Sequence, residues 1–140
     1  MKFFATAALT AAALVAGLSV AQAEMVQMKA MLNGAQEVPA VTTTGTGTAT
    51  FAFDTVTRKL DYDISYSGLT GPAAAAHIHG PAAAGANAGV MVPFPAAASP
   101  IKGSATLTEA QATALMTGNT YVNVHTAAHG GGEIRGQITR

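Results

Sequence analysis

Residues 48–66 read TATFAFDTVTRKLDYDISY and contain two runs in which apolar and polar residues alternate. The apolar positions are Ala49, Phe51 and Phe53 in the first run and Leu60, Tyr62, Ile64 and Tyr66 in the second. A period of two residues is that of a β-strand with one buried face. Residues 54–58 join the two runs, so the stretch predicts a β-hairpin whose apolar side chains share one face.

The same alternation recurs on both sides of the hairpin. Residues 26–33 alternate in this way, and shorter runs that are typical of strands follow at 74–79, 90–94, 102–107, 120–126 and 133–139. Pro93 restricts the run at 90–94 to a sheet edge or a bulge, because proline has no N–H to donate to a neighbouring strand.

One short helix is predicted at residues 109–117. Thr108 and Gln111 have the spacing of a capping box, and Gly118 stands where a left-handed C-terminal cap is needed. Helices do not alternate with the strands in a βαβ pattern. We therefore predict an all-β fold, an antiparallel Greek-key sandwich or barrel of seven to eight strands with one short helix.

The composition excludes several classes of protein. The chain has 140 residues, with seven Lys and Arg, seven Asp and Glu, four His and no Cys. Because the basic residues are few and scattered, we expect no nucleic-acid-binding surface. Without cysteine, a disulfide, a thiolate metal site and a cysteine nucleophile are impossible. Histidine, carboxylate and thioether groups remain as metal ligands.

Residues 1–23 are typical of a secretory signal peptide. They begin with a positive charge at Lys2, continue as an apolar run and end on Ala21-Gln22-Ala23. Small residues at the first and third of these final positions suit signal peptidase. We expect cleavage before Glu24, one β-domain over 24–140 and a periplasmic or secreted location. No later apolar run is long enough to span a bilayer, so we predict no membrane span in the mature protein.

The four histidines form two clusters, His77-Ile78-His79 and the pair His125 and His129. Residues two apart on a strand project from one face about 6.5 to 7 Å apart, which lets two imidazoles bind one metal ion. His129 lies in a glycine-rich stretch that can fold back over the strand end carrying His125. We therefore predict a metal site formed by His77, His79, His125 and His129. Nitrogen ligands suit copper, which we prefer for its tighter binding, or zinc, and suit calcium and magnesium poorly.

Other side chains are weaker candidates for a functional role. Glu133, Asp61 and Asp63 are candidates for orienting an imidazole, although acidic side chains beside turns are typically solvated. Met91 is the methionine nearest to a histidine cluster in the sequence, and core filling is its expected role. No Gly-x-Ser-x-Gly turn or Ser-His-acid arrangement is evident. We therefore assign no catalytic residue and leave enzymatic activity open.

Several stretches of the sequence resemble the CHRD domain, named from chordin. They are LNGAQEVP at 32–39, AHIHGPA at 76–82, LTEAQ at 107–111, YVNVHT at 121–126 and GEIRGQI at 132–138. They follow the family's order over nearly the whole chain after residue 23. The resemblance implies a compact all-β domain, as in single-domain exported bacterial proteins and, repeated, in an extracellular animal antagonist of growth factors. His77, His79 and His125 match recurrent histidines of the family, whereas His129 falls where its pattern is looser.

A more distant likeness is to the copper-zinc superoxide dismutases. These Greek-key barrels also bind copper through an H-x-H strand and a later strand histidine, and Arg135 could correspond to the arginine near their last strand. The chain lacks their disulfide cysteines and an evident bridging histidine. A shared scaffold does not imply shared catalysis.

The sequence leaves three functions open. The first is the binding, storage or delivery of a metal ion by the histidines. The second is interaction with another exported protein, in which case the histidines are structural. The third is a redox enzyme of the dismutase type, with Arg135 guiding an anion to the metal. Because metal–nitrogen bonds are near 2 Å, a separation above about 10 Å between the two histidine clusters would favour the second function.

Overall fold

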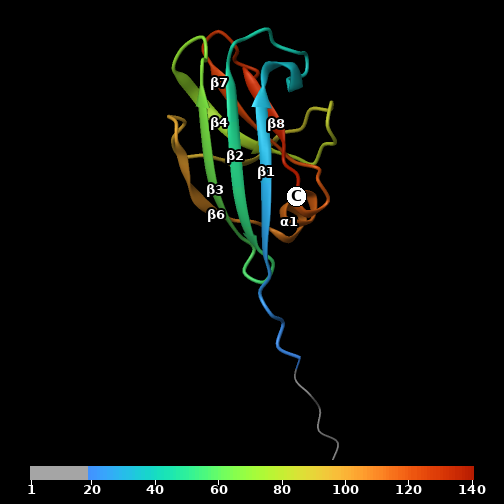
Figure 1. Ribbon diagram of the computed structural model, residues 1–140. Helices are drawn as coiled ribbons and strands as arrows, with labels where there is room; N and C mark the ends of the chain where they lie inside the picture. Colours follow the sequence, from blue (N-terminus) through green and yellow to red (C-terminus); the bar gives the residue numbers. More distant parts are fainter. Residues whose placement is uncertain (1–18) are drawn as a thin grey trace, which may run out of the picture.

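The computed structural model describes residues 19–140, which form an all-β barrel with one short helix (Figure 1). The elements are β1 (Met25–Asn33), the 3-10 helix η1 (Gly34–Gln36), β2 (Thr46–Asp54), β3 (Lys59–Ser67), β4 (Ala73–His79), β5 (Val90–Pro93), β6 (Ile101–Thr106), α1 (Glu109–Met116), β7 (Tyr121–Thr126) and β8 (Ile134–Gln137). The eight antiparallel strands follow the order β5-β4-β7-β8-β1-β2-β3-β6 in one nearly closed sheet. This confirms the predicted fold class. Residues 1–18, most of the predicted signal peptide, lie outside the described residues.

The predicted hairpin forms from β2 and β3. The two strands pair antiparallel with Phe51 opposite Tyr62. Asp54 closes the turn, since its Oδ1 accepts hydrogen bonds from the backbone N–H groups of Val56 and Thr57. β1 pairs with β2 over its full length, so β1, β2 and β3 form one continuous side of the barrel (Figure 1).

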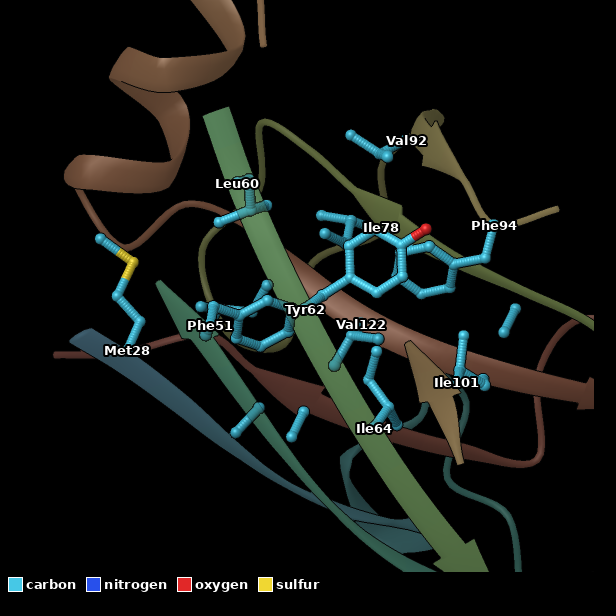
Figure 2. Close-up of a cluster of buried hydrophobic side chains, with 14 of the residues drawn as sticks. Met28, Phe51, Leu60, Tyr62, Ile64, Ile78, Val92, Phe94, Ile101 and Val122 are labelled. Carbon is cyan, nitrogen blue, oxygen red and sulfur yellow. The ribbon is translucent and has the colours of Figure 1, made fainter. Parts of the chain in front are cut away.

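The interior of the barrel is a single apolar core. Figure 2 shows side chains from both halves of the sheet meeting there, namely Met28, Phe51, Leu60, Tyr62, Ile64, Ile78, Val92, Phe94, Ile101 and Val122. The rings of Tyr62 and Phe94 pack with centroids 4.5 Å apart. Since burial of one such side chain stabilises the fold by about 1.5 to 3 kcal/mol, this core accounts for most of the driving force for folding.

The helix forms where its capping residues predict. Thr108 Oγ1 accepts from the backbone N–H of Gln111, and Gln111 Oε1 accepts from the backbone N–H of Thr108. Gly118 follows with a φ of 75°, as a left-handed cap requires. Leu115 is buried in the barrel core, so this short helix is held by packing on the sheet. Within residues 19–140, no helix is long and apolar enough to cross a lipid bilayer.

The strand bounds agree with the prediction to within two residues, and the pairing is irregular at β5 and beyond β8. β5 is an edge strand, as Pro93 predicts, and its register with β4 shifts between Ile78 and His79. β8 ends at Gln137 rather than continuing to residue 139. Beyond it the chain leaves β7 and forms a bridge to β1 between Thr139 and Lys29.

The outer face of β4, β7 and β8 is polar. It carries His77 and His79 from β4, Tyr121, Asn123 and His125 from β7, and Arg135 and Gln137 from β8. Residues 80–89 run over this face and accept hydrogen bonds from Arg135 and Gln137. Residues 81–88 read PAAAGANA, and these small side chains give no sign of the covering role.

Glu133, just before β8, is completely buried and joins three parts of the chain. Its carboxylate accepts hydrogen bonds of 2.6 to 2.9 Å from the hydroxyls of Thr43, Thr70 and Thr126 and from the backbone N–H of Thr70. Burial alone would raise the pKa of Glu133, but these hydrogen bonds outweigh it and lower the pKa to about 2. Glu133 is thus neither solvated nor a partner of an imidazole. It anchors the end of β7, which carries His125.

Replacing Glu133 with glutamine is expected to lower the free energy of unfolding by about 2 to 4 kcal/mol near neutral pH, because an uncharged amide cannot accept all four hydrogen bonds. The folded pKa lies below the ordinary value of 4.5, so this stabilisation is present above pH 4.5 and is lost as the pH falls toward 2. Urea unfolding of the wild type and Glu133→Gln at about pH 7 and about pH 3 measures both effects. The difference between the two proteins should shrink at the lower pH.

Asp61→Asn serves as the control, because Asp61 forms an exposed ion pair with Lys59. The free energy of unfolding of Asp61→Asn should be lower than that of the wild type by less than about 1 kcal/mol. A Glu133→Gln protein no less stable than Asp61→Asn would contradict the proposed anchoring.

Candidate metal centre

His77, His79 and His125 come together on the outer face of β4 and β7. Each offers one ring nitrogen, and these three nitrogens all lie within 4.8 Å of one another. Nδ1 of His77 is 3.0 Å from Nε2 of His125. The two histidine clusters of the sequence therefore meet in the fold, well inside the separation of about 10 Å that would have favoured purely structural histidines.

The strand geometry accounts for this meeting. His77 and His79 share a face because side chains alternate along β4. In the pairing of β4 with β7, His125 lies opposite Ala75, which places it diagonally next to His77. The ring centroid of His77 is 5.5 Å from that of His79 and 4.8 Å from that of His125.

His79 is the most enclosed of the three, with 8% of its surface exposed. Its Nδ1 lies 3.0 Å from the carbonyl oxygen of Ala88. A carbonyl can only accept, so Nδ1 carries the hydrogen and Nε2 presents a lone pair. Nε2 is buried and has no hydrogen-bond partner among the described residues. It is therefore a nitrogen ready to coordinate a metal ion.

His125 is oriented in the same way by a backbone carbonyl. Its Nδ1 lies 3.0 Å from the oxygen of Gly130, so Nδ1 is the donor and Nε2 again presents a lone pair. In the neutral pair, Nδ1 of His77 must donate its hydrogen to Nε2 of His125. If that hydrogen moves to Nε2 of His77, three lone pairs face one another.

The environment favours the neutral form of the outer histidines. Burial lowers the pKa of His77, and the neighbouring His125 and His79 lower it further. Burial also lowers the pKa of His125, and His79 adds to this, although the hydrogen bond to Gly130 acts in the opposite direction. Neutral imidazole is the form that binds metals.

The structure leaves His129 outside this group. Its backbone N–H donates to the carbonyl of Thr126, and its own carbonyl accepts from Gly132, so residue 129 closes the turn after β7. This turn brings the carbonyl of Gly130, rather than the ring of His129, to His125. The structure therefore brings together the rings of His77, His79 and His125, and not that of His129.

Tyr121 supports His79 from β7, a role that the sequence analysis missed. The two rings are stacked, with centroids 4.8 Å apart and an angle of 2° between their planes. The hydroxyl of Tyr121 donates to the carbonyl of Ala88, which also accepts the hydrogen of His79. Tyr121 and Ala88 together fix both the position and the tautomer of His79. The only sign in the sequence was that Tyr121 and His125 share one face of a strand.

Arg135 lies behind this stack. Its guanidinium carbon is 3.4 Å from the centre of the Tyr121 ring, and its terminal nitrogens donate to Asn87 Oδ1 and to the carbonyl of Ala86. Only 2% of Arg135 is exposed. The dismutase hypothesis needs an arginine that meets anions from solvent, and this placement does not support that role.

Glu37 is a second buried carboxyl group on this side of the barrel, with 6% of its surface exposed. Burial raises the pKa of Glu37 to about 6, although the charge of Arg135 and a hydrogen bond from Asn123 act in the opposite direction. Gly132 lies against it with a φ of +121°, and a Cβ at this position would collide with Oε1 of Glu37. Glycine is therefore required at residue 132.

Replacing Glu37 with glutamine is expected to stabilise the protein by about 1 to 2 kcal/mol above about pH 6, because the amide avoids burying a charge. The folded pKa of about 6 exceeds the ordinary value of 4.5, so wild-type stability falls as the pH rises between these values and the penalty then stays constant. Urea unfolding across this range measures the effect, which should vanish below pH 4.5. A less stable Glu37→Gln protein at about pH 8 would show instead that attraction to Arg135 outweighs burial.

The comparison with known families agrees with this architecture. A family model described as the CHRD domain matches residues 28–138, whereas no curated protein and no solved structure matched the chain. The match runs through all eight strands and includes His77, His79 and His125. CHRD domains are extracellular β-domains. Because the match covers well over half of the sequence, the chain belongs to the CHRD domain family.

Proposed function

We propose that His77, His79 and His125 bind a metal ion, with copper as the preferred ion and zinc as the alternative. The observation that carries the proposal is the convergence of three imidazole nitrogens within 4.8 Å. Ligand nitrogens around a metal ion with bonds of about 2.0 to 2.1 Å lie about 3 to 3.5 Å apart. Nδ1 of His77 and Nε2 of His125 already have such a separation, 3.0 Å.

The expected donor atoms are Nδ1 of His77 and Nε2 of both His79 and His125. The carbonyls of Ala88 and Gly130 accept the hydrogens of the two ε-donors, which is the support that metal-binding histidines usually have. A set of nitrogens without sulfur favours Cu(II) or Zn(II) over Ca²⁺ or Mg²⁺. Copper is preferred because, at equal ligands, it binds more tightly than zinc.

This chemistry suggests capture, storage or delivery of a metal ion outside the cytoplasm. CHRD domains are extracellular, and a periplasmic or secreted location with signal-peptide removal at residue 23 fits that placement. His77 and His125 are half-buried, so an ion can reach them without opening the barrel core. Interaction with another exported protein is the alternative function. That alternative does not require three nitrogen lone pairs to converge.

The purified protein is expected to bind about one equivalent of Cu²⁺ by isothermal titration calorimetry, as a single three-histidine site implies. His79→Ala and His77→Ala/His79→Ala should weaken binding by at least about 100-fold, because each lost ligand removes several kcal/mol of binding free energy. His129→Ala is the matched control and should bind copper like the wild type.

His79 is buried, so circular dichroism must show that its variants remain folded. His125→Ala provides a second test at a half-exposed ligand, where folding is less at risk. Retention of wild-type copper affinity in folded His79→Ala and His125→Ala proteins would refute the proposed site.

Copper affinity is expected to be nearly constant above about pH 7 and to fall at lower pH. The pKa values of His77 and His125 lie below the ordinary histidine value of 6.5, so protons compete with the metal only in more acidic solution than for an unperturbed histidine. Above this range, His77 only moves its hydrogen from Nδ1 to Nε2, and binding should release no ligand proton. Calorimetry in buffers of different ionisation enthalpy measures proton release. Because water bound to the copper can release one proton, the release of more than one proton per copper at about pH 8 would contradict this scheme.

A further inference from the structure

We infer that the three-histidine site leaves one coordination position open to solvent and that this position takes small inorganic monoanions. The inference rests on the proposed function and concerns what the site does beyond holding the ion. Four observations support it: the number of ligand nitrogens, the contacts that neighbouring side chains already make, the exposure of the site and its charge.

The number of donors leaves a position unfilled. Among residues 19–140, the group that can hold an ion here consists of three histidines and contains no carboxylate. The divalent ions Zn(II) and Cu(II) take four or more ligands in proteins. Four protein ligands close a site, whereas three leave a position for an exchangeable ligand, as in catalytic zinc sites.

Several side chains near the three histidines are held elsewhere. Asn123, which lies opposite His77, is buried and donates from its amide nitrogen to Glu37, while its Oδ1 has no hydrogen-bond partner among the described residues. The hydroxyl of Tyr121 donates a hydrogen bond to the carbonyl of Ala88 and accepts one from the backbone N–H of Ala88. The carboxylate of Glu133 is surrounded by threonine hydroxyls and is completely buried. Residue 129 closes a turn and its ring is outside the group. Met91 packs against the barrel core.

The site is accessible from solvent. His79 is buried, whereas His77 and His125 are half-buried, so an ion between them lies at the protein surface. On the β5 side, His77 is paired with Pro93 and His79 with Val90, and both partners are exposed. Apolar side chains of this kind cannot supply a ligand. On the other side, the exposed Gly130 has no side chain that could cover the site.

The charge of the site selects anions. Three neutral imidazoles leave the full positive charge of a divalent ion uncompensated. Among residues 19–140, no carboxylate belongs to the group of side chains that converges here. In a partly desolvated place, this positive charge attracts an anionic ligand more strongly than it would in water. A position bounded by the protein on one side admits a small anion more readily than a bulky one.

Azide titration of the copper-loaded protein tests the inference. Electron paramagnetic resonance and the azide-to-copper charge-transfer absorption should both change in a saturable way, with about one azide per copper for a single open position. His129→Ala and Met91→Leu are the matched controls, and both should bind azide with an affinity within about twofold of the wild type, since neither residue fills the position.

The possible outcomes separate the inference from the proposed function. Full copper binding with spectra that azide does not change would overturn the open position and leave the metal site intact. Azide binding that appears only in His129→Ala or only in Met91→Leu would show that the replaced side chain closes the site, and would also overturn the inference. Failure of the wild type to bind copper at all would remove the proposed function itself, and the inference with it.

Discussion

The covering of polar side chains by residues 80–89 is the constraint on which the chemistry of this protein depends. Polar groups removed from water need hydrogen-bond partners, and this loop supplies them as backbone carbonyls. The carbonyl of Ala88 accepts from both His79 and Tyr121, and that of Ala86 accepts from Arg135. A histidine in water exchanges its hydrogen freely between two nitrogens. Beneath the loop His79 keeps one tautomer, and its other nitrogen points toward His77 and His125.

The histidine site is separate from the apolar core that stabilises the fold. The apolar core lies inside the barrel (Figure 2), and the three histidines lie on the outer face of β4 and β7. Ile78 faces the core while its neighbours His77 and His79 face the site, because side chains alternate along β4. Changes at the site can therefore leave the core intact. Membership of the CHRD domain family accounts for the barrel, whereas the chemistry of the site follows from its own geometry.

Local patterns predicted much of this structure. The hairpin at residues 48–66, the capping box at Thr108 and the common face of His77 and His79 all depend on residues close in sequence. Contacts between distant segments could not be predicted in this way. The pairing that brings His125 next to His77 depends on the register between β4 and β7. The hydrogen bond between Thr43 and Glu133 joins residues 90 positions apart, and no local pattern reveals it.

The contact between His77 and His125 joins two strands through side chains that are 48 residues apart in the chain. An ion that bridged these two side chains would be a reversible cross-link between residues 77 and 125, and it would restrict the unfolded chain much as a disulfide does. Exported domains commonly obtain such cross-links from cysteine, which this chain lacks entirely. Reducing agents break a disulfide, whereas chelators or acid would break a cross-link made by a metal ion between histidines. Resistance to proteases outside the cell would then follow the local supply of metal rather than the redox state.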